Sequence, residues 1–367
     1  EQTGQMPDNE KPVSSLNIRE GVSQPPAVNP DIDSRIKQKS GRKLCASSFL
    51  RGITQGDRAV LGQAITLIES NNPKHFDLAQ EVVEKCLPFS NKSLRIGISG
   101  IPGAGKSTFI EAFGTMLTEA GHRVAVLAID PSSVTTGGSI LGDKTRMERL
   151  STNPGAFIRP SPSAGTLGGV ARKTRETIIL CEAAGFDVIL VETVGVGQSE
   201  TAVATMVDFF ILLMVAGAGD ELQGIKRGIM EIADLVAINK ADGENKIRAE
   251  HTASEFRNAV HFFPAPPSGI PTQVVTCSSK YGDGIREIWS LIEDYVRRTE
   301  ESGYFLARRK EQNVQRMNDF IENYLKESFY NDRRVTEIKP LVEKQLREGE
   351  ITSYKGAYIL LNKFLDK

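Results

Sequence analysis

"GIPGAGKS", Gly100 to Ser107, matches the pattern G-x-x-x-x-G-K-S/T. An apolar run typical of a buried strand, "SLRIGIS" (93–99), stands before it, and residues 105–120 have the spacing of a helix. Glycines here let the backbone wrap a phosphate, so that successive amides and the helix N-terminus face its oxygens. The alternative is an ordinary glycine-rich turn, but the flanking strand and helix favour a phosphate-binding P-loop.

This loop supplies the first set of candidate binding residues. Lys106 is predicted to reach the β- and γ-phosphates of a nucleotide, and the hydroxyl of Ser107 is predicted to ligate Mg²⁺. The residues predicted to contact the nucleotide from this loop are Gly100, Ile101, Pro102, Gly103, Ala104, Gly105, Lys106, Ser107 and Thr108.

The rest of the chain alternates strands with helices. Further apolar runs typical of buried strands cover residues 123–130, 187–192, 208–216, 233–239 and 272–278. Helical stretches separate most of these runs. The alternation predicts an α/β fold with a doubly wound, mostly parallel sheet of the P-loop nucleotide hydrolase type.

Four segments are expected along the chain. Residues 1–45 are expected to form a disordered tail rich in Pro, Ser, Gln and Asn, without a signal or transit peptide. Residues 46–92 form an N-terminal helical segment, and 93–300 form the sheet domain. Residues 301–367 carry only helical patterns. This arm is too small for much of a core of its own, so it should pack on the sheet domain or on another subunit.

Composition narrows the class of protein. The formal net charge is -1, which gives no hint of nucleic acid or a membrane surface as partner. No apolar run approaches the roughly 20 residues of a membrane span. The four cysteines form no C-x-x-C pair, which favours a reducing compartment, here the cytoplasm, and gives no metal signal.

"NKAD", Asn239 to Asp242, follows another apolar strand and indicates guanine recognition. The carboxylate of Asp242 can accept hydrogen bonds from N1–H and the N2 amine of guanine, neither of which adenine has. Asn239 can bond the other edge of the base or tie loops together, and the stem of Lys240 can lie along the base. Four residues alone match by chance, but a preceding P-loop strengthens the match. Weaker candidates for the guanine O6 follow the next strand, namely Ser278, Ser279 and Lys280.

"VETVGVGQSE", Val191 to Glu200, follows a buried strand that ends on an acid. In nucleotide hydrolases such an acid, here Glu192, orients Mg²⁺, and the following glycine, here Gly195, senses the γ-phosphate. A solvated acid at a strand end is the alternative. Val196 stands where Ras-type enzymes place a water-positioning glutamine, and Gln198 lies two residues further on. We therefore expect slow hydrolysis by the isolated protein.

Three further features bear on the metal and the phosphates. Asp130 ends the second strand, and Asp143 follows a glycine-rich stretch; both are candidates to face Mg²⁺, although Asp143 fits a helix N-cap equally well. Arg146 is a candidate to reach a phosphate. The polar, glycine-rich loop 216–228 is either a plain surface loop or a gate over the nucleotide.

Taken together, the motifs resemble those of the MeaB-like GTPases, chaperones of the B12-dependent methylmalonyl-CoA mutase that have also been labelled ArgK, a supposed transport-system kinase. The resemblance covers about residues 50–365. It is carried by "GIPGAGKSTFIEAFG", "AIDPSS", "GSILGDKTRM", "FIRPSPSAGTLGGVARKTRET", "VETVGVGQSE", "GDELQGIKRGIMEIADL" and "NKAD".

The resemblance implies a GTPase with a SIMIBI-class G domain that forms a homodimer through its C-terminal helical arm. It implies a complex with methylmalonyl-CoA mutase or a related acyl-CoA mutase, in which GTP hydrolysis gates B12 cofactor loading and protects or reactivates the mutase. The mutase would raise the hydrolysis rate, in agreement with Val196.

The resemblance also implies roles for single residues. The Mg²⁺ ligands fall on Ser107, Asp130, Asp143 and Glu192, which favours the metal role of Asp143 over the cap. A third switch loop places Gln223 and Lys226 as couplers of partner binding to hydrolysis, beside the catalytic candidates Lys106, Glu192 and Gly195.

Two other classes of function stay open at this point. One is a phosphotransferase, the interpretation behind the ArgK label, although no spare acid or histidine stands out as a base for an acceptor. The other is a metallochaperone GTPase, although no Cys/His cluster is visible. The cobalamin-binding pattern D-x-H-x-x-G is missing, so the chain is not expected to hold B12 by itself.

Overall fold

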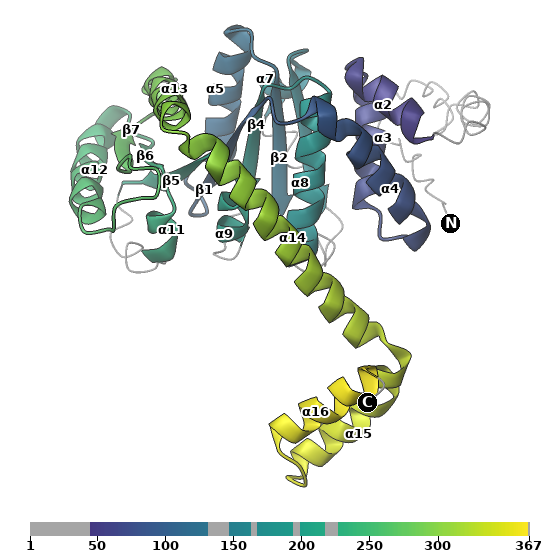
Figure 1. Ribbon diagram of the computed structural model, residues 1–367. Coiled ribbons are helices and arrows are strands. Elements are labelled where there is room, and N and C mark those ends of the chain that lie inside the picture. Colours follow the sequence, from purple (N-terminus) through teal and green to yellow (C-terminus); the bar gives the residue numbers. More distant parts are fainter. Residues whose placement is uncertain (1–44, 131–146, 163–166, 194–198, 217–226, 366–367) are drawn as a thin grey trace, which may run out of the picture. The chain divides into compact units, whose positions relative to one another are not determined.

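In the computed structural model, seven strands form one sheet in the order β3-β2-β4-β1-β5-β6-β7 (Figure 1). The structure describes residues 45–130, 147–162, 167–193, 199–216 and 227–365. Every strand pair in the sheet is parallel, which confirms the predicted doubly wound α/β fold. The strands are β1 Leu94–Gly100, β2 Val124–Asp130, β3 Ala156–Pro162, β4 Val188–Thr193, β5 Phe209–Val215, β6 Leu235–Asn239 and β7 Gln273–Thr276.

Helices precede, connect and follow the strands. Before β1 lie α2 Ala46–Thr54, α3 Arg58–Glu69, α4 Pro73–Cys86 and the 3-10 turn η1 Leu87–Phe89. Between the strands lie α5 Lys106–Glu119, α7 Glu148–Thr152, α8 Leu167–Ala183, α9 Ser199–Ala204, α11 Arg227–Glu231, η3 Gly243–Asn245 and α12 Lys246–Val260. After β7 follow α13 Ile285–Glu301, α14 Tyr304–Asn331, α15 Arg333–Arg347 and α16 Ser353–Phe364.

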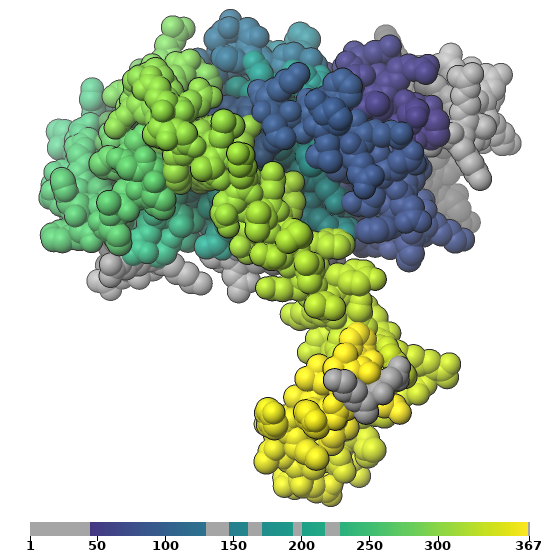
Figure 2. Space-filling view, in the orientation of Figure 1, coloured from purple at the N-terminus to yellow at the C-terminus, as the bar shows by residue number. Residues whose placement is uncertain are grey.

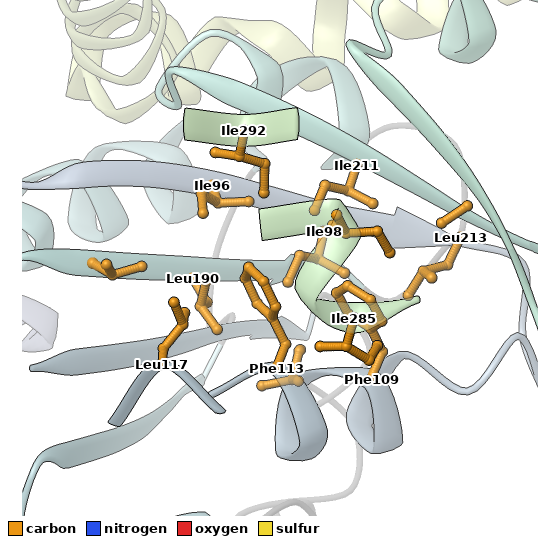
Figure 3. Packing of buried hydrophobic residues seen from close by; sticks show 14 of the residues in the cluster. Ile96, Ile98, Phe109, Phe113, Leu117, Leu190, Ile211, Leu213, Ile285 and Ile292 are labelled. Carbon is orange, nitrogen blue, oxygen red and sulfur yellow. The ribbon is translucent and has the colours of Figure 1, made fainter. Parts of the chain in front are cut away.

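The core on one face of the sheet lies between the central strands and the helices α5 and α13 (Figure 3). Strand β1 sends Ile96 and Ile98 to this face, where Phe113 of α5 and Ile292 of α13 belong to the same buried cluster. The alternate residue Gly97 faces the other side, where an added Cβ would lie 2.7 Å from Phe210 and 3.0 Å from Val203, just before the end of α9. Helix α9 therefore packs closely on the second face.

Strand β3 is absent from the strands predicted above, and its sequence holds Pro160 and Pro162, which are disfavoured in a central strand. In the structure β3 pairs only with β2 and lies at the edge of the sheet. An edge strand tolerates prolines, because one side of its backbone needs no ladder hydrogen bonds.

After β7 the described residues contain no strand, in agreement with the predicted helical C-terminus. Helices α15 and α16 pack on each other, with Phe329 at the end of α14 against Phe364 at a ring separation of 5.4 Å. Residues Cys45–Lys367 belong to one compact unit. Within the parts of the chain that the structure covers, no helix has both the length and the apolar character for crossing a membrane.

Candidate nucleotide site

Two glycines give the P-loop its path over the sheet edge. At Gly100 an added Cβ would lie 2.2 Å from the carbonyl oxygen of Leu213 on β5, so no side chain fits there. Gly105 has φ +87°, and its Cβ would lie 2.8 Å from Nδ2 of Asn239. The left-handed backbone and the close approach both require glycine at this position. The loop is thereby held against the strand that ends in the NKAD motif.

The first turn of α5 faces this loop. Helix α5 begins at Lys106, and its cap residue Gly105 has no side chain that could accept a hydrogen bond from the helix amides. The first backbone N–H groups of a helix have no partner within the helix, and the helix dipole favours an anion beside them. The amides of Lys106, Ser107 and Thr108 can therefore receive phosphate oxygens, as the sequence predicts.

Lys106 lies buried in the loop, with 9% of its surface exposed. Its Nζ donates to the carbonyl oxygens of Gly100 at 2.8 Å and Ile101 at 3.2 Å. Burial is the largest effect and holds the pKa of the Lys106 ammonium below its usual value, and the negative charges of Glu192 and Glu200 partly offset this lowering. The two carboxylates thus favour the charged form of the lysine, which is the form that binds phosphate.

Three of the four predicted metal ligands, Ser107, Asp130 and Glu192, belong to the carboxyl ends of β2 and β4 or to the helix that follows β1. Glu192, 8% exposed, pairs in register with Ile98 of β1 and Ala128 of β2. The hydroxyl of Ser107 donates to Oε1 of Glu192 at 3.4 Å. Hydroxyl and carboxylate oxygens suit Mg²⁺, so these two residues fit the ion. Asp130 ends β2 at the same sheet edge.

Asn239 joins the guanine motif to the P-loop from a fully enclosed position, with 1% of its surface exposed. Its Nδ2 donates to the carbonyl oxygen of Ala104 at 2.8 Å. Its Oδ1 accepts from the backbone N–H of Ser279 at 3.0 Å and from the Ser279 hydroxyl at 2.8 Å. Of the two roles open in the sequence, this geometry is that of tying loops together.

The remaining base-reading candidates surround Asp242. The hydroxyl of Ser278, itself fully buried, donates to Oδ2 of Asp242 at 2.6 Å and so orients the carboxylate. Lys240 has φ +60°, a left-handed conformation that is rare for a residue with a side chain. Asn245 donates to the Lys240 carbonyl oxygen at 2.7 Å and helps to hold it. Lys280 is exposed, with its Nζ 5.1 Å from the centre of the Tyr281 ring.

Some predicted residues are not placed. Those that lie outside the described residues are Asp143, Arg146, Gly195, Val196, Gln198, Gln223 and Lys226. Within the described ranges, no group of three His, Cys, Asp or Glu side chains could hold a metal ion.

Two features of the site escaped the sequence analysis. Glu200, in the first turn of α9, is 1% exposed and acts electrostatically on Lys106. The buried hydroxyl of Thr193 donates to that of Ser99 at 2.8 Å and links the end of β4 to the end of β1. The sequence signal that could have indicated Glu200 is an acid three residues after Gly197, in the glycine-rich stretch that follows β4. No sequence pattern indicates the hydroxyl pair, because it depends on strand order.

Residues 61–334 match the family model described as methylmalonyl Co-A mutase-associated GTPase MeaB. The chain belongs to the MeaB family of GTPases. A putative GTPase of Caulobacter vibrioides is 51% identical over 322 residues, 88% of this chain and 98% of that protein. The mitochondrial methylmalonic aciduria type A homolog of Mus musculus is 46% identical over 323 residues, 85% of this chain and 78% of that protein.

The fold agrees with a solved relative of this MeaB-family protein. The structure titled "LAO/AO transport system kinase" superposes with a TM-score of 0.72 at 36% identity, covering 89% of this chain and 99% of that chain. Family and fold together confirm the predicted enzyme class, a guanine-nucleotide-binding GTP hydrolase.

Proposed function

We propose that this GTPase is a chaperone of a B12-dependent acyl-CoA mutase, with methylmalonyl-CoA mutase as the first candidate. GTP binding and hydrolysis would gate loading of adenosylcobalamin and protect or reactivate the mutase. The family description, which names association with that mutase, supports the partner. The observation that carries the nucleotide role is Asn239, which fixes the guanine motif against the P-loop.

The residues divide the work of hydrolysis between them. Water attacks the γ-phosphorus, the bond to the bridging oxygen breaks, and GDP leaves with the electron pair. The α5 amides and the Lys106 ammonium stabilise negative charge on the phosphate oxygens. Ser107 and Glu192 would hold Mg²⁺, together with Asp130 and Asp143 as the family resemblance implies. When bound, that ion neutralises phosphate charge.

We propose that the partner protein completes catalysis. Val196 has an apolar side chain and is unable to orient a water molecule. Gly195, Gln223 and Lys226 stay candidates for sensing the γ-phosphate and for coupling the partner to hydrolysis, and Arg146 for a phosphate contact. Slow turnover alone and faster turnover with the mutase are therefore expected. A rate that does not respond to the mutase would contradict this role.

Calorimetric titration with GTP, ATP and their diphosphates tests the base assignment. The ordered carboxylate of Asp242 should favour GTP over ATP by more than a factor of ten. Equal affinity would contradict the guanine assignment and favour the ArgK-type phosphotransferase. Nickel or cobalt bound in stoichiometric amount would favour the metallochaperone.

Co-purification of the mutase with the protein loaded with a non-hydrolysable GTP analogue tests the partner. The cytoplasmic location and the segment boundaries stay predictions.

We further propose a homodimer formed through the C-terminal helices. Helix α14 exposes apolar side chains at spacings of three and four residues, a stripe that a second copy can cover. The members of this stripe are Val314, Met317, Phe320, Ile321, Tyr324 and Leu325.

Light scattering on a charged variant tests the dimer. Ile321→Asp combined with Leu325→Asp places carboxylates in the stripe and should yield a monomer. The neighbouring Lys326→Glu adds negative charge outside the stripe and serves as the matched control. A dimer that survives the double substitution would contradict the interface.

A further inference from the structure

Helix α9 packs on β1 and β4, the strands that lead into the P-loop and carry Glu192. It begins at Ser199, and Glu200 in its first turn is buried, where its negative charge partly offsets the lowering of the Lys106 pKa that burial causes. In the present structure Lys106 binds two carbonyl oxygens of its own loop. A triphosphate would draw the Lys106 ammonium toward its oxygens and add negative charge near Glu200. The free energy of this end of α9 therefore depends on the bound nucleotide.

The other end of α9 is bonded to α14, the first helix of the C-terminal arm. Arg308 donates to the carbonyl oxygens of Ala204 at 3.4 Å and Asp208 at 3.0 Å. Gln312 donates to the carbonyl oxygen of Val207 at 2.9 Å. The short connection from α9 to β5 is thus bonded to α14 through the carbonyl oxygens of Ala204, Val207 and Asp208.

A buried ion pair anchors the same stretch of α14. Arg309 donates from Nε to Oδ1 of Asp208 at 2.8 Å and from Nη2 to Oδ2 at 2.5 Å. Its Nη1 and Nη2 also donate to the carbonyl oxygens of Asn91 and Ser93. Asp208 is 2% exposed, so this two-bond pair is sheltered from solvent. The anchor fixes the start of α14 to the sheet.

Arg175 of α8 connects the end of α9 directly to the middle of α14. It is 5% exposed, donates from Nη2 to the hydroxyl of Thr205 at 2.7 Å, and donates from Nη1 to Oδ2 of Asp319 at 3.1 Å. A guanidinium is planar and rigid, so a shift of Thr205 moves the position that best suits Asp319. On α14 the bridge residue Asp319 lies nearly three helical turns beyond the anchor residue Arg309.

One further contact holds α14 at the level of this bridge. The guanidinium of Arg172 lies 5.7 Å from the centre of the Phe76 ring on α4 and 5.9 Å from that of Phe320 on α14. Figure 2 shows α14, in yellow-green, running beside the blue residues of the N-terminal helices. Ile321 and Leu325, next along α14, are 46% and 56% exposed. The contacts of Asp319 and Phe320 therefore lie on the same stretch of α14 as the exposed stripe.

We propose that the Thr205–Arg175–Asp319 bridge transmits the nucleotide state from α9 to α14, so that GTP and GDP set different positions of the arm. This regulation rests on the nucleotide site proposed above. The bridge differs from a mere support because it joins two elements. Helix α9 packs on the strands that lead into the nucleotide site, and α14 carries the dimer stripe. The coupling is reciprocal. The factor by which GTP in place of GDP changes the affinity of the stripe for its partner equals the factor by which covering the stripe changes the ratio of GTP to GDP affinity.

Hydrogen exchange of the full-length protein measures the coupling. Exchange rates of the α14 amides in residues 312–331 are compared with GDP and with a non-hydrolysable GTP analogue bound. We expect a difference of about fivefold or more, the lower end of typical allosteric couplings. In Thr205→Val and in Asp319→Asn the difference should fall below about twofold. Thr205 is exposed and Asp319 is partly exposed, so neither substitution is expected to unfold the protein.

Two further measurements interpret the result. Calorimetry on the same samples should show unchanged affinity for GDP, and Lys310→Ala, an exposed site on α14, should keep the full difference. Nucleotide-independent exchange in the wild-type protein that binds both nucleotides would overturn the proposal, as would full coupling in both bridge variants. Absence of GTP binding would contradict the nucleotide site itself and the coupling with it.

Discussion

Replacing Asn239 by alanine should destabilise the protein even without nucleotide. The side chain is 1% exposed and makes hydrogen bonds to the carbonyl oxygen of Ala104 and to the N–H and hydroxyl of Ser279. Each bond contributes about 1 kcal/mol net. Losing all three bonds should lower the free energy of unfolding by about 3 kcal/mol. The loss is larger if the former partners on Ala104 and Ser279 stay shielded from water.

Urea unfolding of nucleotide-free protein checks this value. With a slope of about 3 kcal/mol per molar urea, the midpoint should fall by about 1 M at unchanged slope. Ser290→Ala is the matched control, because Ser290 also loses a side-chain bond to a backbone carbonyl, but at an exposed helix position. Its effect should stay within about 0.5 kcal/mol.

The same variant tests the link between the two loops. Without the amide, the guanine motif and the P-loop are no longer held together, so affinity for GTP should fall more than tenfold in calorimetry. A loss of stability below 1 kcal/mol would refute the reasoning, because it would mean that other contacts keep the loops in place. A stability loss with unchanged GTP affinity would refute only the functional half.

Three other predictions concern single side chains. Lys106→Ala should abolish GTP hydrolysis in a phosphate-release assay, and unchanged turnover would exclude the P-loop role. Asp242→Asn should shift preference from GTP toward xanthosine triphosphate, whose base suits an amide; competition binding measures it, and an unmoved preference would disprove base reading. Iodoacetamide at pH 8 should alkylate the exposed Cys45 alone, and mass spectrometry should find the other three cysteines unmodified. Burial protects these three, because it raises the pKa of Cys86 to about 11, raises that of Cys277 to about 12, and also raises that of Cys181.

The sheet and the P-loop were predictable from sequence because their signals are local. A buried parallel strand is a continuous apolar run, and the loop between β1 and α5 has a fixed spacing of glycines. Strand β3 was not predicted, and its prolines are a local signal against a strand that its edge position beside β2 makes tolerable. Pairing order is a long-range property that no short window contains.

The arm shows the same limit. Its helical pattern is clear in the sequence, but the sequence around Arg309 does not show whether the guanidinium is buried in an ion pair or exposed to solvent. The structure pairs it with Asp208, so deletion of residues 305–367 would leave a buried carboxylate without its partner. Breaking such a pair costs about 3–5 kcal/mol. Substitutions in the exposed stripe are therefore a cleaner test of the dimer than removal of the arm.

Lys106 has a consequence for the release of product. Its ammonium already has two acceptors within its own loop, the carbonyl oxygens of Gly100 and Ile101. When GDP departs, the lysine can return to these oxygens, so no bare charge is left in a dry place. The vacated loop is then a low-energy resting form, which favours release of GDP at equilibrium. Once the phosphate has gone, the site therefore returns to its resting form through the contacts of Lys106 with its own loop.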